Sequence, residues 1–251
     1  MTLSRPNRPG WIQVDWPGPP GVRVLSTFRG GGASAAPYAS LNLGDHVGDD
    51  PEAVAVNRRE LASAAALPAE PVWLEQVHGV NVADLDVPGP RGAADAAVTR
   101  QLRRVCAILT ADCLPIVLAA QSGEIVAAAH AGWRGLSAGV IEATVLAMGV
   151  SAHTLQVWLG PAIGPDRFEV GAEVREEFLR AQAQAAAAFQ RNARGRFMAD
   201  LGLLARLRLA RLGISRIYGG GECTYSRPDR YFSHRRDGTT GRQATLVWRE
   251  S

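Results

Sequence analysis

Two apolar runs joined by a polar turn stand in the middle of this chain. The first run, Val105 to Ala120, is rich in Val, Ile and Leu, and the second, Glu124 to Ala129, is short and leads to His130. The turn-forming segment Gln121-Ser122-Gly123 between them predicts a hairpin or a closely paired set of strands. Pro115 lies inside the first run and cannot donate to a strand ladder, so the pattern predicts a bulge or a sheet edge there.

Each apolar run also carries residues that a purely structural strand would not need. Asp112 and Cys113 interrupt the first run, and His130 ends the second. The predicted hairpin brings Cys113 and His130 toward one end of the sheet. A thiol beside an imidazole is typical of a metal site or of an activated thiolate nucleophile. An inert buried cysteine is the structural alternative, because free cysteine is among the most buried residue types.

The rest of the pattern alternates short strands with helices. Asp50 as N-cap, Pro51 in the first turn and Glu52 behind it predict a helix over 51–66. Residues 1–21 are rich in Pro and Gly and are expected to be an irregular lead-in, followed by a single domain over 22–251. The other expected strands are 22–28, 72–77, 80–84, 96–98, 156–159, 217–218 and 243–248, and the other expected helices are 136–148, 171–189 and 200–212.

The amino-acid composition limits the kinds of catalysis and of substrate that fit this chain. The 251 residues are 47% hydrophobic and 20% charged, as in an ordinary globular protein, and the formal net charge is +3. The sequence contains no lysine, which excludes a lysine Schiff base, a P-loop lysine and a lysine general base. Arginine is left to bind oxyanions, so an anionic small substrate fits the composition, whereas so small a charge excess does not call for a nucleic acid partner.

The cysteines and the apolar runs indicate the compartment. The sequence has three cysteines, Cys106, Cys113 and Cys223, and a sparse odd set is typical of reducing compartments rather than of a disulfide framework. The first residues show no apolar leader pattern, and no apolar run approaches the length of a membrane span. We therefore expect a cytoplasmic protein that has no membrane partner.

A third candidate ligand is His78, which follows the expected strand 72–77 and precedes a glycine. A lone histidine in that setting is most often structural. If it reaches the same sheet end as Cys113 and His130, two imidazoles and one thiolate form a set suited to Zn²⁺. Three protein ligands leave a fourth position for water or substrate, which is the arrangement of a catalytic zinc site.

Several long sequence blocks resemble a known family. The chain is similar, over residues 22–248, to the YfiH/laccase-domain (DUF152) family, once described as polyphenol oxidases or multicopper laccases and now regarded as purine nucleoside phosphorylases. The blocks that carry the resemblance are PYASLNLGDHVGDDPEAVAVNRREL, WLEQVHG, ADAAVTR, LTADCLPIVLA, VAAAHAGWRGL, WLGPAIGP, FEVG and CTYSRPDRYFSHRRDGTTGRQATLVW.

The resemblance implies an α+β fold, with two mixed sheets packed on each other, helices outside and the site in a cleft at the strand ends. It also implies a cytoplasmic zinc enzyme, a monomer or small homo-oligomer, that cleaves adenosine, inosine and methylthioadenosine with phosphate and also deaminates adenosine. The metal-ligating and catalytic residues would be His78 of WLEQVHG, Cys113 of TADC and His130 of AHAGWRG. Glu75 and Asp45 depart from the usual family pattern without belonging to this ligand set.

Phosphorolysis needs groups that hold phosphate below the ribose C1′ and groups that hold the nucleoside. Arg58, Arg134 and Arg235 are the candidates for phosphate, since a guanidinium binds it bidentately. Asn42 and Asp95 are the candidate nucleoside contacts. The structural alternatives are a solvated helix arginine for Arg58, a turn-capping Asn42 and an Asx-turn Asp95.

Three other functions remain open from the residues. A copper-dependent polyphenol oxidase follows the older family description, but the chain's five histidines are too few for a type-1 copper plus a trinuclear cluster. A thiol amidase or deamidase would use Cys113 as nucleophile and His130 as base. A metal-stabilised adaptor would use zinc only for folding.

Overall fold

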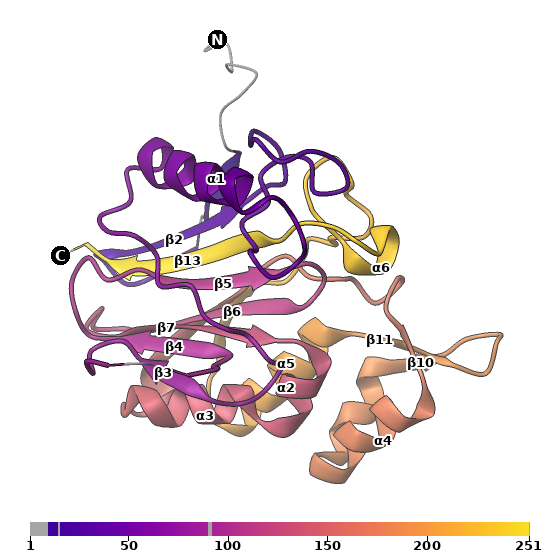
Figure 1. Ribbon diagram of the computed structural model, residues 1–251. Coiled ribbons are helices and arrows are strands. Elements are labelled where there is room, and N and C mark those ends of the chain that lie inside the picture. Colours follow the sequence, from indigo (N-terminus) through magenta and orange to yellow (C-terminus); the bar gives the residue numbers. More distant parts are fainter. Residues whose placement is uncertain (1–9, 15, 90–91, 251) are drawn as a thin grey trace.

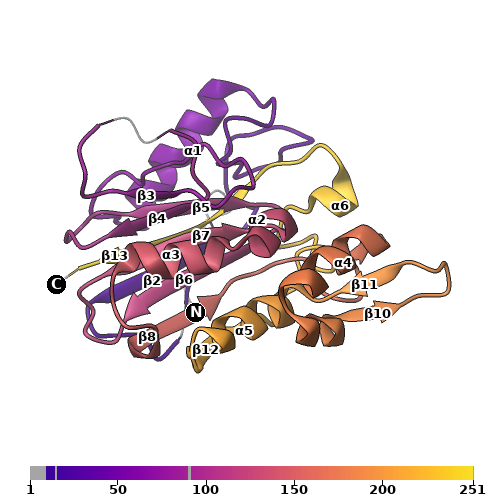
Figure 2. The ribbon, with the colours of Figure 1, turned by 90° about the horizontal axis from the view of Figure 1, so that it is seen from below.

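Two β-sheets lie face to face in this protein, and helices cover the outer face of each (Figures 1 and 2). The structure is a computed structural model that describes residues 10–14, 16–89 and 92–250. The first sheet has four antiparallel strands in the order β1 (Trp11–Gln13), β2 (Val22–Thr27), β13 (Gln243–Arg249) and β5 (Cys106–Thr110).

The second sheet is mixed and has six strands. Their order is β12 (Arg216–Gly219), β8 (Leu155–Leu159), β6 (Leu114–Ala120), β7 (Val126–Ala131), β4 (Ala96–Thr99) and β3 (Val82–Asp84). The outer pairs β12/β8 and β3/β4 are parallel, and the inner pairs are antiparallel. A small antiparallel sheet of three strands, β10 (Phe189–Arg191), β11 (Phe197–Ala199) and β9 (Glu169–Val170), stands apart from both.

Each helix takes its place from an apolar face. Helix α1 (Pro51–Ala64) covers the outer face of the four-stranded sheet through Leu61, which joins a cluster with Leu25, Leu246 and Trp248. The outer face of the six-stranded sheet is covered by α2 (Trp133–Ala138), α3 (Val140–Met148) and α5 (Leu201–Arg211) (Figure 2). The shorter or more peripheral helices are α4 (Ala172–Ala181), α6 (His234–Asp237), η1 (Ala152–Thr154) and η2 (Ala183–Ala188).

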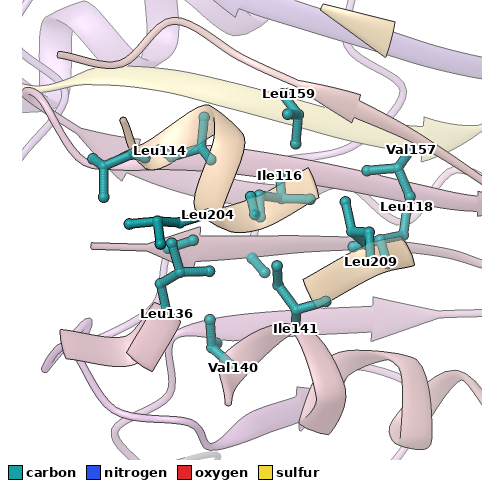
Figure 3. Packing of buried hydrophobic residues seen from close by; sticks show 14 of the residues in the cluster. Leu114, Ile116, Leu118, Leu136, Val140, Ile141, Val157, Leu159, Leu204 and Leu209 are labelled. Carbon is teal, nitrogen blue, oxygen red and sulfur yellow. The ribbon is translucent and has the colours of Figure 1, made fainter. Parts of the chain in front are cut away.

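Strand β6 shows why the sequence builds these layers. Every residue of β6 is buried, and successive side chains point to opposite faces of the sheet. Leu114, Ile116 and Leu118 pack against the helices, as Figure 3 shows, whereas Val117 and Ala119 pack between the two sheets. A strand buried on both faces reads as one continuous apolar run.

Several sequence predictions are confirmed. The α+β class, the two packed sheets and the β6/β7 hairpin are present, although the first sheet is antiparallel and the small third sheet was not expected. Helix α1 begins where predicted, and the Asp50 side chain accepts a hydrogen bond from the Glu52 amide. Strands were also expected correctly at 22–28, 96–98, 156–159 and 243–248, each within two residues of an observed end.

Other predictions are wrong. The run 105–120 is not one strand, because it divides into β5 and β6, which belong to different sheets. Pro115 therefore lies near the start of an interior strand, and β6 pairs with β8 only from Ile116 onward. Residues 72–77 form no strand, and Val72 makes a single bridge to Cys106.

Three expected elements have different boundaries. The helix expected over 136–148 is broken at Gly139, whose φ of 105° is in the left-handed region that favours glycine. The helix expected over 171–189 ends at Ala181 and is followed by η2. The lead-in expected to be irregular includes β1, while residues 1–9 and 15 lie outside the described residues. Among the helices of the described residues, none combines the length and the apolar character needed to cross a bilayer.

The layered packing predicts a contrast between two Leu→Ala changes. Leu118 is fully buried in β6, so Leu118→Ala removes apolar contacts and leaves a cavity, which costs about 2–5 kcal/mol. Leu146 on α3 is 82% exposed, so Leu146→Ala should change the free energy of unfolding by no more than about 0.5 kcal/mol. Denaturant unfolding of both variants, in the same metal state, measures the difference. Equal stabilities would contradict the position assigned to β6.

Candidate metal centre

Cys113 lies where the chain passes from one sheet to the other. Strand β5 ends at Thr110 and β6 begins at Leu114, so the three residues between them cross between the layers. Asp112 has a φ of 93°, a backbone conformation that non-glycine residues rarely adopt. The crossing is therefore a strained turn, and the surrounding structure has to hold it in place.

Hydrogen bonds from three separate segments hold Asp112. Its Oδ1 accepts a hydrogen bond of 2.6 Å from the Thr224 hydroxyl, and its Oδ2 accepts one of 2.7 Å from the Arg235 amide. Its carbonyl oxygen accepts a hydrogen bond of 2.9 Å from the Ile163 amide. These bonds fix the backbone that presents the Cys113 side chain.

His130 reaches the same end of the six-stranded sheet through the predicted hairpin. In the β6/β7 register, Leu114 lies opposite Ala131 and Pro115 lies opposite His130. Cys113 immediately precedes Leu114, so antiparallel pairing brings the thiol and the imidazole together. The predicted approach of these two residues is confirmed.

His78 comes from the loop that replaces the expected strand 72–77. The Gln76 side chain makes the two hydrogen bonds that the backbone of a neighbouring strand would make. Its Nε2 donates to the Leu109 carbonyl and its Oε1 accepts from the Leu109 amide, both at 2.8 Å. His78 itself has a left-handed φ of 61°. The loop is thus attached to β5 just before the Asp112 crossing.

The three predicted ligand residues converge. One ligand atom from each of His78, Cys113 and His130 lies within 4.8 Å of the others. The Cys113 Sγ is 3.8 Å from the His78 Nε2, and the two imidazole centroids are 4.7 Å apart. A Cβ at Gly132 would lie 2.9 Å from both the Cys113 Sγ and the His78 Cδ2, so only glycine fits here. Within the described part of the chain, this is the one group of three or more His, Cys, Asp or Glu residues able to share an ion.

Asp95 organises two of the three ligands. It is fully buried, and its Oδ1 lies 2.8 Å from the His130 Nδ1 and accepts a 2.9 Å hydrogen bond from the His78 amide. Its Oδ2 accepts bonds from the amides of Val77, at 3.2 Å, and Gly79, at 2.6 Å. A carboxylate only accepts hydrogen bonds, so the His130 Nδ1 carries a proton, and the Nε2 can offer a lone pair to a metal once it has lost its own proton.

The electrostatics of the cluster favour charged ligands. Burial alone would raise the pKa of Cys113, but His130 and His78 together lower it to about 6. Burial alone would lower the pKa of His130, but Cys113 and Asp95 raise it to about 9. Burial also opposes ionisation of Asp95, yet hydrogen bonds from His130 and Gly79 hold its pKa below the ordinary value. At neutral pH the metal-free cluster therefore favours a thiolate beside an imidazolium.

The two predicted nucleoside contacts have other roles. Asn42 and Asp95 are both fully buried, so neither can touch a bound nucleoside in this arrangement. The Asn42 amide donates to the Gly44 carbonyl and to Asp49, and its Oδ1 accepts from the amides of Gly44 and Arg242. Asn42 is a turn-capping residue, whereas Asp95 orients the His130 ring and the His78 backbone.

Arg58 is held by its own surroundings. Its Nε and Nη2 donate to the Leu43 carbonyl at 3.0 and 2.8 Å, its Nη2 is 3.3 Å from Asp45, and its guanidinium stacks on Trp73 at 4.4 Å. The Nε and Nη2 of Arg58 are thus already hydrogen-bonded within the protein, and its positive charge is already paired with Asp45. The phosphate role predicted for Arg58 has no support in this geometry.

The other two predicted arginines are more accessible. Arg134 is exposed, and its guanidinium lies 4.6 Å from the centre of the Trp133 ring. The Arg235 Nη1 donates to the Glu169 carbonyl at 2.9 Å, and its guanidinium lies over Phe168. The structure therefore does not direct either guanidinium to the cluster, and their phosphate role stays a prediction.

Sequence reasoning missed two residues that shape the site, Gln76 and Gly132, and a third, Arg242, that lies next to the Asp112 crossing. Gly132 appears in the sequence only as one residue of the block VAAAHAGWRGL, and the Gln76 side chain gives no pattern in the sequence. Arg242 precedes the last strand, far along the chain from every ligand. Only the β13/β5 pairing brings it beside the Asp112 crossing.

The fold and the cluster define a class of protein: an α+β domain with two packed sheets and, among its described residues, one group of three side chains able to hold a metal ion. A family model described as multi-copper polyphenol oxidoreductase laccase matches residues 23–250. The chain belongs to this family.

Relatives and solved structures agree. The chain is 54% identical to a purine nucleoside phosphorylase of Pseudomonas aeruginosa, over 95% of this chain and 98% of the relative. It is 50% identical to the purine nucleoside phosphorylase YfiH of Escherichia coli, over 94% and 98%. A Neisseria meningitidis protein of the DUF152 family superposes with a TM-score of 0.92 at 45% identity, covering 96% of this chain and all 100% of that one. YlmD from Geobacillus stearothermophilus gives 0.90 at 32% identity, covering 100% and 98%.

Asp95→Asn tests the orienting carboxylate. The change keeps the shape of the side chain but removes the charge that faces the His130 Nδ1–H, so metal affinity should fall about 10- to 100-fold. Competition with a chromophoric chelator measures the affinity. Asp86→Asn is the matched control, because Asp86 also accepts from a hydroxyl, that of Thr99, and from a backbone amide, that of Arg100, but does so outside the cluster. Equal metal affinity in Asp95→Asn and the parent would refute the role of Asp95.

The pKa of Cys113 predicts the pH dependence of its alkylation in metal-free protein. Below the pKa the sulfur is a protonated, unreactive thiol, and above it the reactive thiolate, so iodoacetamide labelling should rise with a midpoint near pH 6. Peptide mass mapping distinguishes Cys113 from Cys223 and from Cys106, which is fully buried with a raised pKa and should not react. A midpoint near the ordinary thiol value of about 8.5 would contradict the assigned electrostatics.

Proposed function

We propose that this protein is a zinc-dependent purine nucleoside phosphorylase that cleaves adenosine, inosine and methylthioadenosine with phosphate and also deaminates adenosine. The observation that carries the proposal is the convergence of His78, Cys113 and His130 on one point. The names of the similar proteins from Pseudomonas aeruginosa and Escherichia coli support the reaction class. The oligomeric state, the cellular location and the absence of a nucleic acid partner stay predictions.

The donor atoms fit zinc. Two imidazole nitrogens and a thiolate are typical zinc ligands, and three protein ligands leave one position for a reactant. The hydrogen bond from His130 to Asp95 is the second support that zinc-ligating histidines commonly have. When bound, Zn²⁺ supplies a Lewis acid that stabilises negative charge developing in the transition state.

The residues of the chain contribute position and charge. In phosphorolysis, the bond between the purine nitrogen and the ribose C1′ breaks while an oxygen of hydrogen phosphate bonds to C1′, and the proton that the phosphate gives up balances the one taken up by the leaving purine. Asp95 fixes the His130 ring and the His78 backbone before any ligand arrives, so the cluster does not have to reorganise during the reaction. Cys113 is half-buried and His78 is exposed, so the cluster is accessible from solvent on the His78 side.

A multicopper oxidase is less well supported by the placement of the histidines. The remaining three histidines form no second ion group among the described residues. His46 lies beside Asp45, His153 bonds Ser151, and His234 donates to the Gly238 carbonyl.

A thiol amidase or deamidase is the second candidate. Such an enzyme needs a thiol of lowered pKa near an imidazole, and the Cys113 Sγ lies within 4.8 Å of a ring nitrogen of His130. The two candidates differ in what removes activity. A thiol enzyme keeps its activity when metal is chelated and loses it when the thiol is alkylated. The proposed phosphorylase loses its activity when the metal is removed.

The test is release of free purine from adenosine and inosine with phosphate, together with metal analysis. We expect about one zinc per chain, loss of activity on chelation and recovery with added zinc. Cys113→Ser should lower kcat/KM about 100-fold or more, equivalent to about 2.7 kcal/mol of lost transition-state stabilisation. The matched control, Cys223→Ser, alters a half-buried cysteine outside the cluster and should stay within about twofold of the parent. Phosphate-dependent release that persists without metal would overturn the proposal.

A further inference from the structure

Arg242 lies next to the crossing that carries Cys113. Gln243 pairs with Thr110 in the β13/β5 register, so the preceding residue, Arg242, stands where β5 runs into Asp112 and Cys113. The negative groups that favour its charged form are, in order, Cys113, Asp112 and Tyr38. Its positive charge also lowers the pKa of His46, after the larger effect of burial. The register thus places Arg242 next to the Asp112 crossing, and Cys113 and Asp112 are the two negative groups that act most strongly on its charge.

The charge of Arg242 is only partly compensated by the protein. The residue is half-buried, and burial lowers its pKa. Among the described residues it forms no ion pair, in contrast to Arg58 with Asp45. Asp112, which lies nearby, already accepts two hydrogen bonds from other residues. If Cys113 is a metal ligand, its negative charge is shared with the ion, and Arg242 is left with room for an additional anion.

The protein also holds the guanidinium in one orientation. The Nη1 donates to the carbonyls of Thr240, at 2.9 Å, and Gly241, at 3.0 Å. The Arg242 backbone amide donates to the Asn42 Oδ1, and a Cβ at Gly44 would lie 2.8 Å from the Arg242 Cγ. Within the described residues the Nε and Nη2 have no protein acceptor. This edge is the one with which arginine binds an oxyanion through two parallel hydrogen bonds.

We propose that the Nε–Nη2 edge of Arg242 binds the phosphate that attacks the nucleoside. This inference rests on the proposed function, because it names the residue that positions the second substrate at that site. A phosphate dianion beside the carboxylate of Asp112 and the sulfur of Cys113 needs a fixed cation, and Arg242 supplies it. Asn42 then acts as a positioning residue, since its side chain holds the arginine backbone instead of touching nucleoside.

The experiment compares phosphate binding and phosphate KM in the zinc-loaded parent and in Arg242→Gln. Loss of a charged, bidentate contact should weaken phosphate binding, measured by calorimetry, and raise the phosphate KM about 10- to 100-fold. Zinc content and nucleoside affinity without phosphate should stay within about twofold of the parent. Arg242→Lys keeps the charge but loses the two-point contact, so its phosphate KM should rise several-fold, and this variant decides the question if Arg242→Gln does not fold.

Arg206→Gln is the matched control. Arg206 is also half-buried, donates to two backbone carbonyls, those of Ile217 and Gly219, and forms no ion pair among the described residues, but it lies on α5. Its replacement should leave phosphate binding unchanged. A parental phosphate KM and affinity in a folded, zinc-loaded Arg242 variant would overturn the inference.

The two proposals fail in different ways. One result is that the parent binds phosphate and Arg242→Gln does not, but no purine is released from any nucleoside. This result supports the anion site and contradicts the proposed function. If purine is released with phosphate and the Arg242 variants match the parent, the proposed function stands and the role of Arg242 falls.

Discussion

One buried carboxylate fixes the geometry on which the site depends. Asp95 directly precedes β4 and receives hydrogen bonds from the His130 ring and from three consecutive backbone amides around His78. A fully buried charge is tolerated only when it is paired and hydrogen-bonded, so removing any of these donors leaves the carboxylate in an unfavourable environment. The requirement to satisfy Asp95 therefore holds a hairpin strand and a separate loop in the relative positions that a metal ion needs.

The Asp112 crossing sets the third ligand in the same way. The layered core requires β5 and β6 to lie in different sheets, so the chain must turn sharply between them. The left-handed φ of Asp112 is the local cost of that turn, and its carboxylate recovers stability through Thr224 and the Arg235 amide. Asp95 and Asp112 thus use one physical device: a buried or nearly buried carboxylate, satisfied by backbone amides and a neighbouring side chain, holds a strained ligand-bearing loop.

How much of this was predictable from the sequence depends on whether local patterns decide the structure. The cap at Asp50 and the turn before β7 are local, and the predicted helix and hairpin are present. The division of 105–120 was hidden because β5 and β6 are both buried on two faces, so their apolar residues run together. The strand expected at 72–77 failed because Gln76 binds the Leu109 backbone with its side chain, a bond that no period of apolar residues reveals.

Some features of the site could likewise be predicted from local sequence, whereas others depend on contacts between distant segments. The family motifs named the three residues that the structure brings together, and the hairpin explained the approach of Cys113 and His130. The sequence could not show which arginine is free to bind phosphate, because that depends on which guanidinium N–H groups are already hydrogen-bonded to protein acceptors. Arg58 is bound to the Leu43 carbonyl and to Asp45, while Arg242 is brought next to the Asp112 crossing only through strand pairing between distant segments.

The arrangement of the candidate ligands also bears on two reaction types, the one in the description of the family model and the one in the names of the similar proteins. Multicopper oxidation passes electrons between several ions, and it therefore needs more than one group of ligands. The described residues provide a single group of three, with a half-buried arginine beside it and no second cluster of histidines. If one ion binds there, it suits the proposed transfer of a group between a neutral nucleoside and an anion, because that chemistry needs charge stabilisation and positioning at a single point.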